Sequence, residues 1–323
     1  MQPKSFSIGI DIGGTNTAFG IVNRRGDILA QERLHTKDYE TPTLFIDAIK
    51  AHLQPYIEQY DKEQINGIGV GAPNANYYSG NIELAANLQW KGTIPLRTLI
   101  EDAFDLPVTV TNDANATAIG EMIYGAAKGM KDFIIITLGT GVGSGFVANG
   151  QLIYGHDGFA GELGHVIAVR NGRSCGCGRH GCLETYASAT GIVRTAYEML
   201  ERNPPAASTP PGWLSTVYKE TGEVSSSGIH KAALAGDPMA REIFDFTGKI
   251  LGQTLADAVA ITSPEAIIFF GGLTKAGDFI LKPSKKYMEE NLLAIFKNKI
   301  DIIPSGLSER DAAILGAAAL AWG

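Results

Sequence analysis

The chain has 323 residues, of which 45% are hydrophobic and 19% are charged. This composition excludes disordered, collagen-like and coiled-coil chains, and the length predicts about two domains. The net charge of −7 disfavours nucleic-acid binding, which depends on Lys and Arg. No apolar run approaches the ~18 residues of a membrane helix, and the first residues do not resemble a signal peptide. We therefore expect a cytoplasmic protein with no membrane or nucleic-acid partner.

Short apolar runs that are typical of β-strands occur throughout the first third of the chain. The glycine turn Asp11-Ile12-Gly13-Gly14-Thr15 separates the first two runs. The fourth run ends in Gly71-Ala72-Pro73, and the fifth stops at Asn112-Asp113. The predicted strands comprise residues 6–10, 17–22, 28–34, 65–71 and 108–111.

Helices are predicted where capping residues precede amphipathic or alanine-rich segments. Thr41-Pro42 is typical of a helix start, and Pro55 is expected to kink or end the helix that follows. The other predicted helices comprise residues 114–124, 241–261 and 312–321. The proline-rich residues 204–212 are predicted to form an exposed loop between helices.

The pattern of strand, glycine turn and strand then occurs a second time. Strands are predicted at residues 133–138 and 145–148, with a hairpin partner at 151–154, around the turn Gly139-Thr140-Gly141-Val142-Gly143. A further buried strand, residues 266–270, precedes Gly271-Gly272. An internal duplication explains this pattern and predicts two α/β lobes that face each other across a cleft.

The two glycine turns can grip one phosphate chain through backbone N–H groups and threonine hydroxyls. Asp11 lies at the mouth of the first turn and can hold Mg²⁺ through water, although a plain hairpin turn is the alternative. The sequence contains no P-loop motif. A Rossmann site is also excluded, because the Gly13-Gly14-Thr15 turn leads into a strand rather than a helix.

Asn112-Asp113 places a carboxylate where a strand ends and a helix begins. Asp113 can serve as the base that accepts a proton from a hydroxyl that receives a phosphoryl group. Both residues are also favoured helix caps. The residues alone leave both roles open, and the two roles are compatible.

All three cysteines lie within eight residues, and His165 lies ten residues upstream of the first. His165, Cys175, Cys177 and Cys182 form the donor set of a closed, structural zinc site. Buried free thiols are the alternative, and His180 is a rival for the fourth ligand.

These motifs together resemble the ROK family of sugar kinases and related repressors. The resemblance rests on the Asp-x-Gly-Gly-Thr turn, Asn112-Asp113-Ala114-Asn115, Gly161-Glu162-Leu163-Gly164-His165 and the cysteine motif that ends in Glu184. The segment 187–191 is similar to that of bacterial ROK glucokinases. The resemblance implies a two-lobed, actin/hexokinase-like (ribonuclease H-like) α/β ATPase fold. We expect a small lobe of residues 1–112 plus 306–323 and a large lobe of residues 113–305.

The resemblance also implies roles for individual residues. Asp113 would be the catalytic base, and Mg²⁺ and ATP would be cofactors alongside a structural Zn²⁺. His165 would serve both metal and sugar through its two ring nitrogens. The residues implied to face the nucleotide are Asp11, Gly13, Gly14, Thr15, Thr140, Gly141, Gly271 and Gly272. The residues implied to face the sugar are Gly71, Asn87, Asn112, Asp113, Glu162, His165 and Glu184.

The expected reaction is phosphorylation of a hexose at its 6-hydroxyl, with glucose as the favoured substrate. Asn74-Ala75 replaces the Gly-Pro that glucokinase-like members tend to carry, so N-acetylglucosamine, N-acetylmannosamine and fructose stay as alternatives. A sugar-responsive repressor is disfavoured, because the first predicted strand begins at Phe6 and leaves no room for a helix-turn-helix. The family also implies a dimer or tetramer.

Overall fold

The computed structural model describes residues 3–85, 87–202 and 212–322. The predicted loop at residues 204–212 lies outside this part, except for Gly212. The chain forms two compact units: the first comprises Met1–Lys131, Gly145–Gly161 and Ser305–Gly323, and the second comprises Asp132–Ser144 and Glu162–Pro304. The predicted lobes instead divide at Asn112, and as functional lobes they stay a prediction.

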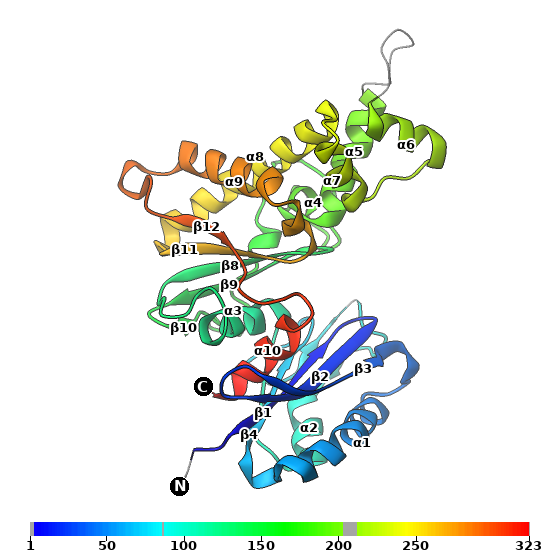
Figure 1. Ribbon diagram of the computed structural model, residues 1–323, viewed down its shortest axis with the longest axis vertical. Coiled ribbons are helices and arrows are strands. Elements are labelled where there is room, and N and C mark those ends of the chain that lie inside the picture. Colours follow the sequence, from blue (N-terminus) through cyan, green and yellow to red (C-terminus); the bar gives the residue numbers. More distant parts are fainter. Residues whose placement is uncertain (1–2, 86, 203–211, 323) are drawn as a thin grey trace. The chain divides into compact units, whose positions relative to one another are not determined.

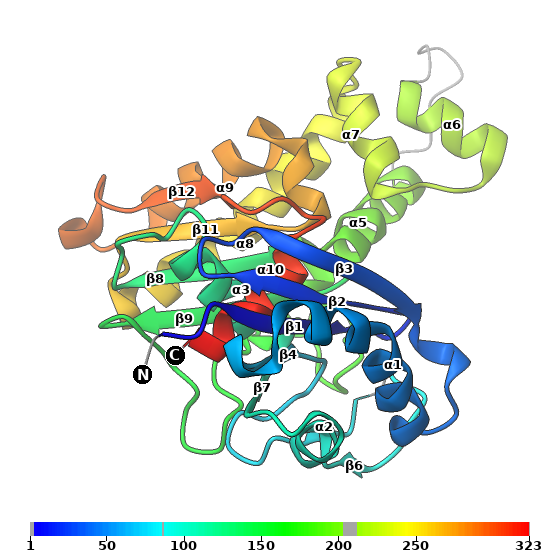
Figure 2. The same ribbon diagram turned by 60° about the horizontal axis from the view of Figure 1, so that its bottom comes forward.

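A five-stranded sheet forms the centre of the first unit, in the order β3-β2-β1-β4-β7 (β1 to β4 are labelled in Figure 1 and all five strands in Figure 2). β1 pairs antiparallel with β2 and parallel with β4, which pairs parallel with β7. The carboxyl ends of β1, β4 and β7 therefore lie at one edge. The strands are β1 (Phe6–Ile12), β2 (Asn16–Asn23), β3 (Ile28–His35), β4 (Ile65–Gly71) and β7 (Val108–Thr111).

Helices cover both faces of this sheet (Figure 2). α1 (Pro42–Tyr60) and α2 (Leu96–Phe104) lie on one face, and α3 (Asp113–Ile123) and α10 (Ala312–Ala319) lie on the other. α10 approaches so closely that a Cβ on Gly69 would lie 1.8 Å from the carbonyl oxygen of Ala317. β5 (Ile82–Glu83) and β6 (Thr93–Ile94) form a separate small sheet.

The second sheet has the same strand order as the first, β10-β9-β8-β11-β12. β11 pairs parallel with both β8 and β12, as β4 does with β1 and β7. This correspondence confirms the predicted duplication of an α/β unit. The strands are β8 (Phe133–Leu138), β9 (Val142–Ala148), β10 (Gln151–Leu152), β11 (Ala266–Phe270) and β12 (Asp301–Pro304).

The longest helix of the second unit, α8, packs along α9 and also contacts α4, α5 and α7. These helices are α4 (Glu184–Ala187), α5 (Ala189–Arg202), α6 (Trp213–Thr221), α7 (Ser226–Leu234), α8 (Pro238–Thr262) and α9 (Asp278–Asn291). None of the helices in the described ranges has the length and apolar character needed to cross a membrane.

Two elements differ from the sequence prediction in an instructive way. α1 continues past Pro55 to Tyr60, and Pro55 is exposed. It lies on the exposed face, where water can satisfy the carbonyl that a proline leaves without a partner. β9 begins at Val142, three residues earlier than predicted. The last two residues of the predicted glycine turn therefore belong to the strand.

Candidate active site

Polar residues collect at the edge where the parallel strands of the first sheet end. Asp11, Gly71 and Thr111 are neighbours in register across β1, β4 and β7. Asn112 and Asp113 follow Thr111 directly. Ligands of open α/β sheets bind outside the carboxyl ends of strands. This edge is therefore the candidate site of phosphoryl transfer.

Asn112 and Asp113 do different things at the start of α3. The side-chain oxygen of Asn112 accepts a hydrogen bond from the backbone N–H of Asn115 at 2.7 Å and caps the helix. The Asp113 carboxylate accepts a hydrogen bond from the N–H of Ala114 at 2.8 Å. Asp113 keeps an exposed surface. The capping task thus falls to Asn112, and Asp113 is available for chemistry.

Asp11 and Asp113 lie on either side of Gly71. A Cβ at Gly71 would lie 3.5 Å from a carboxylate oxygen of Asp11 and 3.6 Å from the Cα of Asp113. Burial raises the pKa of Asp11 to about 7, and the charge of Asp113 adds to this shift. Although part of Asp113 is exposed, desolvation of its carboxylate also raises its pKa, and hydrogen bonds from backbone N–H groups oppose this shift. The pair therefore resists double ionisation and would favour a cation beside it.

The first glycine turn is held by contacts that the sequence did not reveal. The Thr36 hydroxyl donates to the carbonyl of Gly13 at 2.8 Å, and the Thr36 N–H donates to the carbonyl of Thr15 at 2.8 Å. A Cβ at Gly14 would lie 2.5 Å from the backbone oxygen of Asn87. The predicted phosphate turn and the predicted sugar residue Asn87 are therefore in backbone contact, and Thr15 is exposed.

The second glycine turn follows β8 in the second unit. The N–H of Ala189 donates to the carbonyl of Gly139 at 2.8 Å. The hydroxyl of Thr190 donates to the carbonyl of Thr140 at 2.7 Å. These bonds attach the turn to the start of α5 and leave the exposed Thr140 facing solvent.

Gly271 and Gly272 follow β11, which pairs with β8 in parallel. Gly271 has φ +105°, and a Cβ there would lie 2.7 Å from the carbonyl oxygen of Leu138. Packing against β8 therefore explains Gly271. Around Gly272, no described atom lies within 4 Å of the position a Cβ would take. Gly272 is the better candidate for close approach by a ligand.

The predicted metal residues converge in the second unit. One ligand atom each from His165, Cys175, Cys177 and Cys182 lies within 4.8 Å of all the others. The Sγ atoms of Cys177 and Cys182 are 3.6 Å apart, and Cys175 Sγ is 3.7 Å from His165 Nδ1. Tetrahedral zinc with bonds of ~2.3 Å separates sulfur ligands by roughly 3.8 Å. The donor set and its spacing fit zinc, with Nδ1 as the histidine ligand.

His180 does not belong to this group among the described residues. It pairs instead with Ser174 in an isolated β-bridge and is exposed. The bridge closes the loop that carries Cys175 and Cys177.

Glu184 places its carboxylate beside the predicted metal ligands, and Glu162 contacts them through its backbone. One Glu184 oxygen is 3.0 Å from Cys175 Sγ and 3.7 Å from His165 Nδ1. The other oxygen lies 2.7 Å from where a Cβ at Gly141 would be. The carbonyl of Glu162 accepts a hydrogen bond from the N–H of His165. Glu184 therefore lies between the group of predicted metal ligands and the second glycine turn.

Thr36 and Arg173 are the supporting residues that sequence reasoning missed. Thr36 contacts a residue 23 positions away, and Arg173 pairs with Glu198 25 positions away. No local pattern predicts such contacts. The one available signal was an arginine two residues before a metal-ligand cysteine.

The duplicated sheets, the two glycine turns and the strand-end carboxylates define the actin/hexokinase-like class of phosphotransferase folds. A protein-family model described as "ROK family" matches residues 7–323. The chain belongs to the ROK family.

Similar proteins include enzymes and a regulator. A glucokinase of Halalkalibacterium halodurans is 37% identical over 87% of this chain and 84% of its own length. The crystal structure of a ROK family glucokinase from Streptomyces griseus, in complex with glucose and AMPPNP, is 34% identical, covers 98% of both chains and has a TM-score of 0.78. A xylose repressor of Caldicellulosiruptor bescii is 29% identical over 97% of this chain and 77% of its own length.

Proposed function

We propose that this protein is an ATP-dependent hexose kinase that converts glucose to glucose 6-phosphate. The observation that carries the proposal is the carboxylate of Asp113 at the start of α3, beside Asp11 at the end of β1. The glucokinases at 37% and 34% identity support glucose as the substrate.

Asp113 orients the 6-hydroxyl of the sugar and accepts its proton as the phosphoryl group is transferred. A general base works best when its pKa approaches the operating pH, and burial moves the pKa of Asp113 in that direction. Asn112 keeps this carboxylate in place, because its side chain caps the helix on which Asp113 lies.

The glycine turns bind the phosphates of ATP through backbone N–H groups. Gly13, Gly14 and Thr15 supply one turn, and Thr140 and Gly141 supply the other. Gly272 lies against the adenosine of ATP. Asp11 suits Mg²⁺, since Mg²⁺ favours one or two carboxylates plus phosphate oxygens. Bound Mg²⁺ would neutralise charge on the phosphates during transfer.

Glu162, His165 and Glu184 recognise sugar hydroxyls other than the one that reacts, and Gly71 and Asn87 complete the sugar contacts. His165 presents Nδ1 to Cys175, which leaves Nε2 for the sugar. Zinc bound to His165 and the three cysteines would fix the loop that positions these groups.

We further propose that the protein acts in the cytoplasm as a homodimer or homotetramer. The confinement of its three cysteines to one metal-ligand set suits a reducing compartment. Light scattering coupled to size-exclusion chromatography measures the oligomeric state.

A sugar-responsive repressor is the second candidate, favoured by the similarity to the xylose repressor. A gel shift with genomic fragments, with and without sugars, tests it. We expect no shift, because the chain carries a net charge of −7.

The experiment that tests the main proposal is a phosphorylation screen with ADP release as the readout. Glucose, mannose, fructose, N-acetylglucosamine and N-acetylmannosamine are compared by kcat/KM. We expect glucose to be the best substrate. A higher value for an N-acetylated sugar would overturn glucokinase while retaining sugar kinase.

A further inference from the structure

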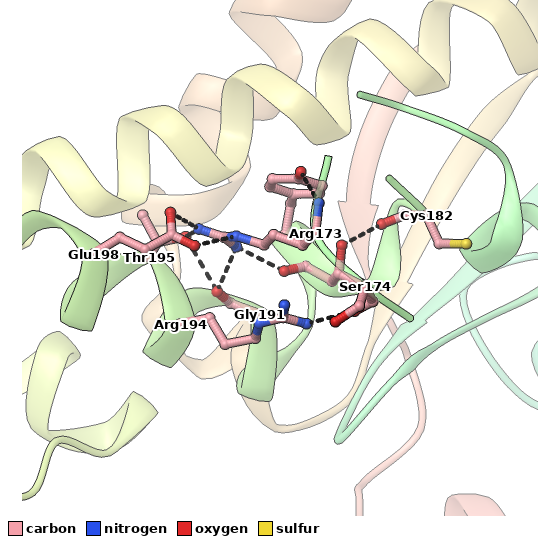
Figure 3. A network of polar contacts seen from close by, with 9 residues as sticks. Arg173, Ser174, Cys182, Gly191, Arg194, Thr195 and Glu198 are labelled. Atoms are coloured by element: carbon pink, nitrogen blue, oxygen red, sulfur yellow. Dashed lines mark hydrogen bonds and ion pairs between the residues drawn. The ribbon is translucent and has the colours of Figure 1, made fainter. Parts of the chain in front are cut away.

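Arg173 makes a hydrogen bond with each of its five side-chain N–H groups (Figure 3). Its side chain is 6% exposed. Nε and Nη2 both donate to the Glu198 carboxylate at 2.8 Å. Nη1 donates to the carbonyls of Thr185 and Gly191, and Nη2 also donates to the Thr195 hydroxyl. The guanidinium is therefore fully satisfied by protein groups and is not a ligand-binding cation.

Tyr186 covers one face of this guanidinium. The centre of its ring lies 4.4 Å from the Arg173 Cζ atom. The Tyr186 hydroxyl accepts a hydrogen bond from the backbone N–H of Arg173 at 2.9 Å. Side chain and backbone of Arg173 are thus held by the same residue.

The partners of Arg173 connect the metal loop to the helices behind it. Arg173 precedes Cys175 by two residues, and its carbonyl accepts from the N–H of Gly181, next to Cys182. On the other side, Thr185 follows Glu184 in α4, and Glu198 belongs to α5. The Thr185 hydroxyl donates to the carbonyl of Cys182 at 2.7 Å. Arg173 therefore links both ends of the cysteine loop to the segment that carries Glu184, through its backbone carbonyl on one side and its guanidinium on the other.

We propose that Arg173 is a positioning residue that holds the zinc loop and the Glu184 carboxylate in the geometry that binds the sugar. The part of this inference that concerns sugar binding rests on the proposed function. The part that concerns the metal rests on the fit of the four ligands to zinc.

Lysine cannot replace Arg173 in this role. An ammonium has three donors and no planar fork, so it cannot bind Glu198 through two parallel hydrogen bonds while reaching both carbonyls. The Arg173→Lys variant keeps the charge and leaves several buried acceptors without a donor.

The experiment compares Arg173→Lys with the matched control Arg194→Lys. Arg194 donates a hydrogen bond of 3.0 Å to the carbonyl of Ser174 in the same loop (Figure 3). Three quantities are measured on the whole protein: the rate of zinc release to a chromogenic chelator, the Kd for glucose by calorimetry without ATP, and KM for glucose and ATP. Circular dichroism reports folding.

Loss of groups that orient metal ligands typically costs 10–100-fold, so we expect Arg173→Lys to speed zinc release and weaken glucose binding by about tenfold or more. KM for ATP should change much less, since the Gly139–Gly141 turn keeps its own bonds from Ala189 and Thr190. The control should match the wild type. A general loss of stability would instead lower the folded fraction, and with it kcat, and leave both KM values and the Kd for glucose unchanged, and that result would overturn the proposal.

If Arg173→Lys does not fold, Glu198→Gln replaces it. This variant keeps the size of the side chain and removes the charge that Arg173 binds. We expect faster zinc release and weaker glucose binding, by a smaller factor than for Arg173→Lys. Values equal to the Arg194→Lys control in both assays would contradict the proposal. If the wild type proves inactive on glucose, the proposed function fails, and zinc release still tests Arg173.

Discussion

At the scale of single residues, Asn112 and Asp113 are adjacent at the start of α3, and the sequence allowed either of them to cap the helix. The structure gives the cap to Asn112, whose side chain accepts from Asn115. The Asp113 carboxylate accepts hydrogen bonds from local backbone N–H groups, including that of Ala114. A change at Asp113 can therefore be made without removing the cap.

Asp113→Asn should abolish most activity and leave the fold intact. The variant keeps the size and the acceptor oxygen but removes the base, a loss that typically costs ~10²–10⁴ in rate. We expect kcat to fall by this factor while the thermal midpoint and the Kd for glucose stay near wild type. Retention of more than about a tenth of kcat would exclude Asp113 as the base.

Asp11 should make the stability of the metal-free protein depend on pH. Its folded-state pKa is raised from 3.8 to about 7. Between these values the unfolded chain has lost this proton and the folded chain retains it, so stability falls as the pH rises through this window. Asp11→Asn, which is neutral throughout, should gain stability relative to wild type at pH 8 and not at pH 4.

Thermal unfolding in the presence of EDTA and without nucleotide measures this difference. A difference between wild type and Asp11→Asn that does not change from pH 4 to pH 8 would show that the Asp11 pKa is not raised.

At the scale of elements, the two glycines after β11 differ in what they do. Gly271 has a positive φ and packs against the carbonyl of Leu138, so its glycine is required by the fold. Gly272 is surrounded by open space among the described residues. Packing therefore does not account for this glycine, and Gly272 stays a candidate for contact with the nucleotide.

Gly272→Ala should therefore raise KM for ATP while the thermal midpoint stays unchanged. The added methyl group meets no described protein atom but would meet the adenosine. Gly271→Ala is the contrasting variant, and it should lower the thermal midpoint. An unchanged KM for ATP in Gly272→Ala would remove Gly272 from the nucleotide site.

The cysteine loop should lose both zinc and function in Cys177→Ser. Cys177 is the most exposed of the three thiols and contacts Cys182 at 3.6 Å. Without zinc the loop no longer fixes His165 and Glu184, so sugar phosphorylation should be lost. The thermal midpoint should fall less than in small zinc domains, because a large core supports the fold. If elemental analysis finds no zinc in the freshly purified wild-type protein, the zinc site is refuted.

Elements defined by local pattern could be predicted from the sequence. The bounds of β7 and β8 agree with the prediction, because apolar runs between turn residues specify buried strands. The elements that were not predicted are α2, α4 to α7, α9, β5, β6 and β12. Among them, α9 contains Pro283, and β12 is a short strand whose place depends on pairing with β11.

The same distinction applies to the candidate site. The candidate metal ligands and the strand-end carboxylates follow from motifs that are local in sequence. The roles of Thr36 and Arg173 arise from contacts with distant segments, which no motif encodes. Roles that depend on long-range contacts therefore needed the structure.

At the scale of the whole molecule, the two sheets share one strand order and each places a glycine turn after its first strand. The first unit adds Asp11 and Asp113 to this plan. The second unit adds the group formed by His165 and the three cysteines, with Glu184 beside it. One duplicated scaffold thus provides a glycine turn twice. Under the proposed function, the additions would supply a base in the first unit and sugar ligands in the second.

The measurement that tests this account most directly is the product formed from glucose and ATP by the purified protein. Glucose 6-phosphate is detected with glucose-6-phosphate dehydrogenase, and ADP is measured in the same sample. The account predicts equal amounts of both products, since the base acts on the 6-hydroxyl. ADP without glucose 6-phosphate, or no reaction with glucose at all, would contradict it.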